Sequence, residues 1–243
     1  MHEEYWHPVK NADTAILFIH GIAGTPRHFA PFLPLVPENV SVCALLLEGH
    51  GRGVRDFSRA SMAGWEAQVR NAVDTLASSH QQIFLVAHSM GTLFAIEQAL
   101  REPKITKLFL LAVPLRIFLR PRLFLTSAKV FFDRIGPGDE VAAAARDCYG
   151  IAPDRNPLHY LRWIPRYLEL FRKIRQIRGL LPALKTCGSV FQSSGDEMVS
   201  LRALGDLRGC SSLQVHVLPK SGHYYYQEQD KAFLLETFRQ MIS

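Results

Sequence analysis

The sequence predicts an α/β protein with a mainly parallel central sheet and helices on both faces of that sheet. Short apolar runs recur along the chain, and most are continuous rather than alternating. Continuous runs are typical of parallel strands that are covered on both faces. Segments with helical spacing of apolar residues separate these runs, and this alternation of strand and helix is typical of α/β architecture.

The strands and helices can be placed in order along the chain. Buried strands are predicted at residues 15–19, 40–47, 83–87, 108–113 and 188–192. A sixth strand at residues 213–219 alternates more and is expected nearer an edge of the sheet. Helices are predicted at residues 61–80, 90–102 and 227–242. Residues 1–113 and 186–243 therefore form the predicted core domain.

Residues 114–185 break the alternation, because they are basic, helix-like and rich in Phe, Leu and Arg. This segment follows the strand that ends near Val113. An insertion at the carboxyl end of a strand should fold over the edge where ligands bind in open α/β proteins. We therefore predict a small helical cap, and a peripheral helical subdomain without contact to the site is the alternative.

The composition indicates a globular protein. The 243 residues are 48% hydrophobic and 21% charged, which is enough for one large core. No apolar run approaches the roughly 18 residues of a membrane span, and the acidic, aromatic start does not resemble a signal peptide. The four cysteines lack CxxC spacing, which argues against a zinc site and a disulfide framework. We expect a soluble, cytoplasmic protein.

The net charge of +6 is concentrated in the predicted cap. Between Arg116 and Lys185 the chain has 14 Lys and Arg against 6 Asp and Glu, so the remainder is close to neutral. Such a block could face nucleic acid, an anionic lipid surface or acidic substrates, or it could be a solvated helical surface.

A polar pair interrupts the apolar segment LVAHSMGTLF, which begins at Leu85. The preceding run is a predicted strand and the following residues have helical spacing, so Ser89 lies at a tight strand-to-helix turn. Such a turn crowds the positions two before and two after the serine, and these are the small residues Ala87 and Gly91. The pattern predicts a nucleophile elbow that exposes the Ser89 hydroxyl. A serine that caps a helix is the alternative, and it requires no catalytic partners.

The partners that a nucleophilic serine needs follow in the expected order. A base must take the hydroxyl proton, and an acid must hold that base. Asp196 follows one predicted strand and His223 follows the next, so both lie at the same sheet edge as Ser89. Glu197 is the second candidate for the acid, and we expect it to be solvated. His88 is interpreted only as the middle residue of the elbow.

Backbone donors for an oxyanion are predicted at two places. Met90 follows the nucleophile, and its N–H group opens the helix. The second donor should come from the glycine-containing loop HGIAGTP after the first strand, where Ile22 is best placed. This loop lacks the Gly-Lys-Ser/Thr and GxGxxG patterns of phosphate sites.

The motifs HGIAGTP, EGHGRG, AHSMG, SGDEMVS and SGH, in this order, resemble those of the α/β-hydrolase superfamily. Within it the chain is similar to bacterial carboxylesterases and monoacylglycerol-lipase-like enzymes, which carry a small helical cap. The resemblance implies an α/β-hydrolase fold with the same triad and oxyanion donors. It also implies that His50, in EGHGRG, is a structural or pocket-lining residue.

The expected function is hydrolysis of short- to medium-chain carboxylic esters, including monoacylglycerols, without a metal or cofactor. A thioesterase, an amidase, a C–C bond hydrolase and a non-catalytic binding protein are the alternatives. Dehalogenase chemistry places a carboxylate where Ser89 stands, which argues against that activity.

The cap is expected to supply substrate contacts through Phe118 and Phe171. Its outward basic face, which is expected to include Arg172, Lys173, Arg175 and Arg178, would give weak contact with an anionic lipid surface. No nucleic-acid partner is expected.

Overall fold

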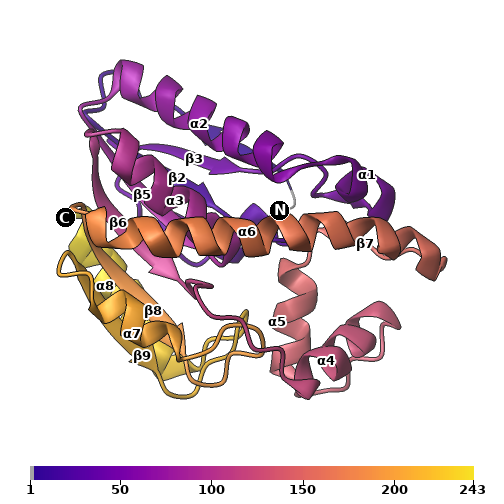
Figure 1. Cartoon of the computed structure of the whole chain (residues 1–243). Coiled ribbons are helices and arrows are strands. Elements are labelled where there is room, and N and C mark those ends of the chain that lie inside the picture. The colour runs from indigo at the N-terminus through magenta and orange to yellow at the C-terminus, as the bar shows by residue number, and fades with distance from the viewer. Residues whose placement is uncertain (1–2) are drawn as a thin grey trace.

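The computed structural model describes residues 3–243. Within them, seven strands form one sheet in the order β1–β3–β2–β5–β6–β8–β9 (Figure 1). Strand β1 is antiparallel to β3, and the other neighbours are parallel. The bounds are β1 Tyr5–His7, β2 Thr14–Ile19, β3 Ser41–Leu45, β5 Gln82–His88, β6 Ile105–Leu111, β8 Cys187–Ser193 and β9 Leu213–Leu218. The predicted α/β fold is confirmed, and β9 lies at an edge as its alternating pattern predicts. The short edge strand β1 was not predicted.

Helices cover both faces of the sheet. Neighbouring residues of β2 show why the strand runs are continuous, since Leu17 belongs to the core cluster on one face and Phe18 to the cluster on the other. The first face carries α2 (Met62–Ser79), α3 (Met90–Arg101), α6 (Ile164–Leu180) and α7 (Ala203–Arg208). The second face carries α8 (Glu228–Ile242) and the 3₁₀ helices η1 (Pro26–Phe29) and η2 (Leu33–Leu35).

The segment between β6 and β8 contains helices that lie beyond the sheet edge (Figure 1). They are α4 (Pro121–Phe131), α5 (Glu140–Cys148) and the 3₁₀ helix η3 (Pro157–Trp163). The short strand β7 (Ile151–Ala152) pairs with β4 (Arg52–Gly53), and helix α1 (Val54–Arg59) follows β4 directly. The 3₁₀ helix η4 (Leu181–Ala183) leads to β8.

Helix α6 was predicted as part of the cap, with its apolar face toward a pocket and its basic face in solvent. Instead, Leu170, Ile174 and Ile177 pack into the core beside α2 and α3. Lys173, which was expected on the basic face, is only 3% exposed. Its Nζ lies 2.7 Å from Glu66 Oε1 on α2 and 2.5 Å from Glu97 Oε1 on α3. The sequence pattern did not reveal this burial, because the two carboxylates that pair with Lys173 lie on other helices, and the lysine alone has the pattern of an ordinary surface residue.

Three further findings concern membrane-spanning helices, cysteines and groups of metal-binding side chains. In residues 3–243 no helix is long and apolar enough to cross a membrane. All four cysteines are free thiols. No group of three or more His, Cys, Asp or Glu side chains in this range is arranged to hold a metal ion.

Candidate active site

Ser89 lies between the last residue of β5 and the first residue of α3, with φ 51° and ψ −124°. A positive φ is strained for a residue with a side chain, and such strain costs about 1–3 kcal/mol. The surroundings leave no room for larger neighbours. A Cβ at Gly91 would lie 2.2 Å from the Ile19 carbonyl oxygen, and a Cβ at Gly21 would lie 2.7 Å from Ser89 Cβ. The structure therefore has the strand-to-helix turn of a nucleophile elbow.

Asp196 and His223 meet at the same sheet edge. His223 Nδ1 donates a hydrogen bond of 2.8 Å to Asp196 Oδ2, and both side chains are buried. The other carboxylate oxygen, Oδ1, accepts the backbone N–H groups of Met198 and Val199 at 2.7 Å each. His223 Nε2 is buried and has no hydrogen-bond partner in the described part of the chain. This is the ring atom that a base would use.

The base is brought close to the elbow. The ring centroids of His223 and His88, the residue before Ser89, are 4.6 Å apart. The three predicted triad residues therefore follow strands β5, β8 and β9 at one edge of the sheet.

Glu197 is not solvated, contrary to the expectation from sequence. It is 5% exposed, and its Oε2 accepts the backbone N–H of His223 at 3.0 Å. The backbone explains the burial, because Arg120 N donates to the Glu197 carbonyl at 2.9 Å and Phe118 N donates to the Met198 carbonyl at 3.0 Å. The chain that enters the cap thus covers the residues after Asp196.

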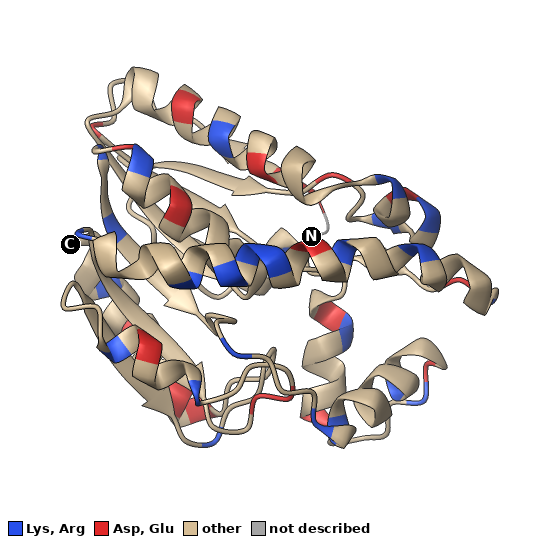
Figure 2. Ribbon diagram, viewed as in Figure 1, with Lys and Arg blue, Asp and Glu red and all other residues tan. Residues whose placement is uncertain are grey.

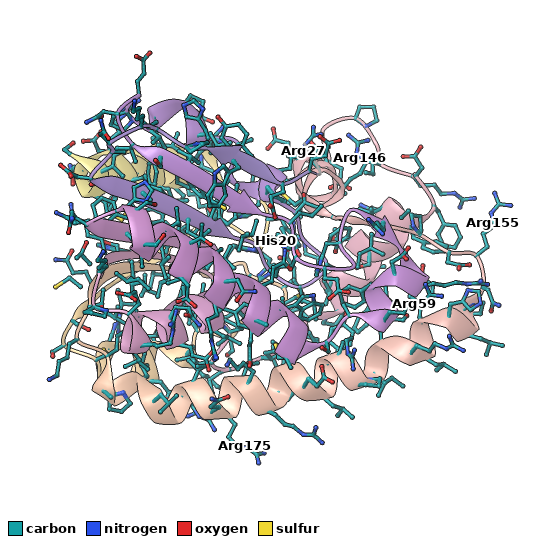
Figure 3. The ribbon with its side chains drawn as sticks, turned by 90° about the horizontal axis from the view of Figure 1, so that it is seen from above. His20, Arg27, Arg59, Arg146, Arg155 and Arg175 are labelled. Atoms are coloured by element: carbon teal, nitrogen blue, oxygen red, sulfur yellow. The ribbon has the colours of Figure 1, made fainter. Side chains whose placement is uncertain are left out.

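The loop after β2 is held by two buried histidines. His20 Nε2 accepts the Leu47 N–H at 3.0 Å, and His50 Nε2 accepts the Ala23 N–H at 3.1 Å. Burial lowers the pKa of His50 to about 4 and lowers the pKa of His20 well below its usual value, so both rings are neutral and can accept. His50, predicted as pocket-lining or structural, lies behind this loop, and Figure 3 shows His20 in the interior.

The two predicted oxyanion donors belong to residues near Ser89, since Met90 follows it directly and Gly21, the residue before Ile22, packs against it. Met90 is the first residue of α3, so its N–H has no partner within the helix. Ile22 N donates no backbone hydrogen bond within residues 3–243. Ala23, the next residue, has a positive φ of 57°, which turns the loop sharply at this point.

The segment that follows α5 is attached to the same loop through Gly150. Gly150 N donates to the Ala23 carbonyl at 2.8 Å, and Gly51 N donates to the Gly150 carbonyl at 2.6 Å. A Cβ at Gly150 would lie 2.1 Å from Thr25 Cγ2, so only glycine fits this close approach. The backbone of the predicted cap therefore touches the predicted oxyanion loop.

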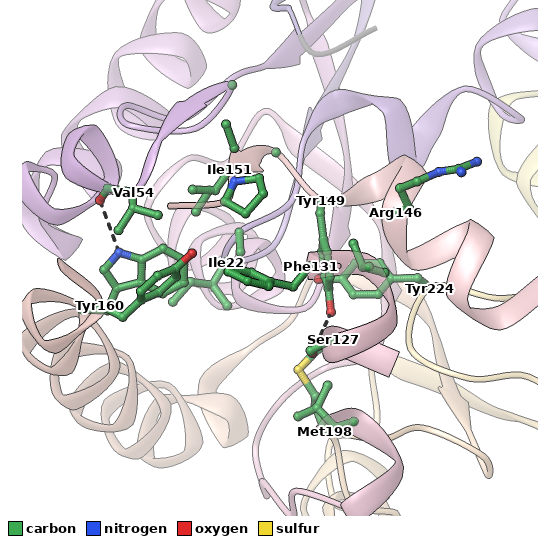
Figure 4. A pocket seen from close by; sticks show the side chains of 18 of the residues that line it. Ile22, Val54, Ser127, Phe131, Arg146, Tyr149, Ile151, Tyr160, Met198 and Tyr224 are labelled. Atoms are coloured by element: carbon green, nitrogen blue, oxygen red, sulfur yellow. Dashed lines mark hydrogen bonds between the residues drawn. The ribbon is translucent and has the colours of Figure 1, made fainter. Parts of the chain in front are cut away.

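A cavity of about 570 Å³ opens beside these residues (Figure 4). Ile22 and Ala23 form part of its wall, and Tyr224, the neighbour of His223, forms another part. Most of the remaining wall is aromatic or aliphatic and comes from the segment between β6 and β8. These residues include Leu123, Val130, Phe131, Tyr149, Tyr160, Trp163 and Tyr167.

The polar groups of the cavity wall include several hydroxyls and one charged side chain, that of Arg146. Burial raises the pKa of Tyr167 to about 12 and raises the pKa values of Tyr149 and Tyr224 above their usual value. Tyr149 Oη lies 3.5 Å from Ser127 Oγ. The cavity suits an apolar group better than a charged one.

Phe118 and Phe171, the predicted substrate contacts, do not line this cavity. They are 62% and 49% exposed and lie at a separate groove with Arg116, Arg175 and Arg178. Tyr160, Trp163 and Tyr167 line the cavity instead, although their helical spacing is equally typical of packing positions. Of the three tyrosines that directly follow His223, Tyr224 lines the cavity, and its position next to the predicted base was the available signal.

The fold and this arrangement define the class of protein. The model of the alpha/beta hydrolase family matches residues 16–236, and the chain belongs to that family.

Several relatives are similar to this chain. A thermostable monoacylglycerol lipase of Bacillus sp. strain H-257 is 30% identical over 97 residues, which span 40% of this chain and 39% of that lipase. A structure of the metagenome-derived lipolytic enzymes LipS and LipT has a TM-score of 0.74 at 19% identity, covering 99% of this chain and 97% of that one.

Two further structures have the same fold. A monoacylglycerol lipase of Paleococcus ferrophilus has a TM-score of 0.66 at 17% identity, covering 99% of this chain and 98% of that one. A putative ancestral haloalkane dehalogenase has a TM-score of 0.65 at 16% identity, covering 99% and 94%. Likeness at these identities shows the fold alone.

Proposed function

We propose that this protein is a serine hydrolase that cleaves carboxylic esters through an acyl-enzyme. The observation that carries the proposal is the strained Ser89 turn beside a buried His223–Asp196 pair whose Nε2 has no partner within residues 3–243. A serine at this turn, rather than a carboxylate, favours ester hydrolysis over the dehalogenase activity named for one structural neighbour.

The chemistry follows from these groups. Ser89 Oγ attacks the ester carbonyl carbon while His223 Nε2 takes the hydroxyl proton. The N–H groups of Ile22 and Met90 bind the oxyanion of the tetrahedral intermediate. The bond to the alcohol oxygen then breaks, and His223 returns the proton to the leaving alcohol. Water attacks the acyl carbon next, with His223 as its base, and this step releases the acid and restores Ser89.

The cavity supports an apolar acyl substrate. Most of its wall is aromatic or aliphatic, and burial raises the pKa of Tyr167, so this hydroxyl is neutral. Two similar proteins are named monoacylglycerol lipases. We infer a monoacylglycerol or another medium-chain ester as substrate, with thioester, amide and C–C bond cleavage as alternatives on the same triad.

We infer that the working cap is smaller than residues 114–185. Helix α6 packs into the core from Leu170 onward, whereas Tyr167 in its first turns lines the cavity, so the part that covers the site is residues 114–167.

Weak contact with an anionic lipid surface is part of this proposal. Leu161, Ile164 and Leu168 are exposed at the end of η3 and the start of α6, next to cavity residues Trp163 and Tyr167. Lys and Arg residues recur along α6 (Figure 2), and Arg175 points away from the body of the protein (Figure 3). An apolar strip with flanking arginines is suited to the surface of an anionic bilayer.

Two measurements test the proposed function. Wild-type protein should be labelled by a fluorophosphonate probe at Ser89, and Ser89→Ala should abolish labelling and reduce ester turnover by several orders of magnitude. Hydrolysis of nitrophenyl esters of increasing chain length should peak at a medium length. An unlabelled wild-type protein, or turnover that persists in Ser89→Ala, would contradict the assignment.

A further inference from the structure

His88 has a contact that the elbow itself does not require. Its Nε2 lies 3.0 Å from the backbone carbonyl oxygen of His223. The His88 ring also stacks on His28, with centroids 3.9 Å apart and an angle of 29° between the rings. The side chain is 1% exposed, so the ring is fixed between the elbow and the loop that carries the base.

The protonation state of His88 fixes the direction of this hydrogen bond. Burial, together with the neighbouring His28 and His223, lowers the pKa of His88 well below its usual value, so the ring is neutral and carries one N–H. A carbonyl oxygen can only accept, and the N–H therefore lies on Nε2. His88 donates to the peptide of His223.

Glu197 contacts the same residue from its other end. Its Oε2 accepts the His223 N–H at 3.0 Å. The carboxylate fits against the preceding residue, since a Cβ at Gly222 would lie 3.1 Å from Oε2. The other oxygen, Oε1, is buried without a hydrogen-bond partner in the described chain, and Arg122 Nε lies 4.0 Å from it. The Glu197 carboxylate thus provides the acceptor for the backbone N–H of His223.

The segment that carries His223 needs such support. Residues 219–227 connect β9 to α8 without helix or strand. Asp230 orders its start, where Oδ2 accepts the Ser221 hydroxyl at 2.7 Å and Lys220 N at 3.1 Å. The peptide of His223 itself is held by two side chains from outside this segment, His88 at the carbonyl and Glu197 at the N–H.

We propose that His88 and Glu197 are positioning residues, which hold the His223 backbone from both ends so that its imidazole stays aligned between Asp196 and Ser89. This inference rests on the proposed function, because it concerns the base of the same reaction. Misplacement of a reacting group by about 1 Å can cost on the order of 10²-fold in rate. The two contacts act on the base and not on the substrate, so their loss should reduce kcat and leave KM little changed.

Paired substitutions separate the loss of a hydrogen bond to the His223 backbone from the change in side-chain size. Gln at position 88 places its amide nitrogen near the position of Nε2, whereas Asn places it near Nδ1, too far from the carbonyl. Gln at position 197 keeps an acceptor for the His223 N–H, whereas Leu removes it. We expect His88→Asn and Glu197→Leu to lose roughly 10²-fold in kcat. His88→Gln and Glu197→Gln should recover most of that loss.

A matched control tests whether the loss of any buried histidine is sufficient to reduce kcat. His80 is buried, and its Nε2 lies 2.8 Å from Ser41 Oγ. His80 precedes β5, so it lies at the opposite end of that strand from Ser89. His80→Asn should lower the thermal midpoint but leave kcat unchanged. Circular dichroism of each variant reports folding, and the His88 and Glu197 pairs are independent tests if one of the variants does not fold.

The outcomes distinguish this inference from the proposed function. A folded His88→Asn and a folded Glu197→Leu with wild-type kcat, or a loss confined to KM, would overturn the positioning role while wild-type labelling of Ser89 still supports the hydrolase. Failure of both Gln variants to recover activity would also overturn it. Wild-type protein without labelling or ester turnover would overturn both.

Discussion

The two sides of the candidate active site are built differently. The side formed by the sheet holds Ser89, Asp196 and His223 in buried positions, with hydrogen bonds that fix the acid and the base. The side formed by the proposed cap is more exposed, because α4 has no buried residue and Leu158 in η3 is 67% exposed. Substitutions on the first side should therefore change the rate of the chemical step. Substitutions on the second should change which surface or substrate is bound.

The sharpest test of this contrast is the acid. Asp196→Asn should reduce kcat on the order of 10⁴-fold, as in the Ser-His-Asp triad, because an amide no longer fixes the imidazole in the required tautomer. Steady-state hydrolysis of a nitrophenyl ester measures the effect. Asp206→Asn is the control, since Asp206 pairs with Arg116 outside the site and its loss should leave kcat unchanged. A mild effect of Asp196→Asn would show that the buried hydrogen bond does not act in catalysis.

The stability of the protein should also depend on pH, because histidines are buried on the side formed by the sheet. The pKa of His50 is about 4 in the folded protein, below the value of about 6.5 in the unfolded chain. The unfolded chain therefore binds more protons between pH 4 and 6.5, and stability falls as the pH falls through this window. From pH 7 to pH 5, His50 should cost about 2 kcal/mol of the free energy of unfolding.

Urea denaturation at the two pH values measures this loss. His50→Gln should remove that share of the pH dependence, whereas substitution of the exposed His7 by Gln should retain the wild-type dependence. Equal pH dependence of His50→Gln and wild type would contradict the neutral, buried His50.

The smallest effect is expected on the cap side. Arg175→Gln should weaken binding to vesicles that contain anionic lipid by roughly fivefold, since each basic residue near such a surface contributes about 1 kcal/mol. Leu161→Ser with Leu168→Ser should weaken binding further, and turnover of a small soluble ester should stay at the wild-type value.

The controls for vesicle binding lie on another surface. Phe233→Ser, on the exposed part of α8, should leave vesicle binding intact. Wild-type binding should decline as salt is raised, because exposed charges are screened within about 10 Å at 0.1 M. Vesicle binding that does not change with salt, or no vesicle binding at any ionic strength, would contradict a lipid partner for this basic surface.

The sequence predicted the parts of the molecule whose causes are local. Continuous apolar runs located the parallel strands, and small residues around Ser89 indicated the strained turn that the structure contains. The order of Asp196 and His223 after successive strands was sufficient to place them at one edge.

The sequence did not reveal features that depend on distant partners. Lys173 is buried only because Glu66 and Glu97 arrive from two other helices. Glu197 is buried only because the chain entering the cap folds over it. The aromatic wall at Tyr160 and Trp163 has the same spacing as an ordinary packed helix, so no periodicity distinguishes the two.

Gly150 has a consequence for how the cap can change. Its two backbone hydrogen bonds, and the β4–β7 pairing next to it, join the middle of the cap to the loops that contain Ala23 and Gly51. This attachment divides the proposed cap into two parts, with α4 and α5 before Gly150 and η3 after it. Because these contacts hold the middle of the proposed cap against the loop that contains Ile22, we expect α4 with α5 and η3 to move independently of each other when a substrate enters.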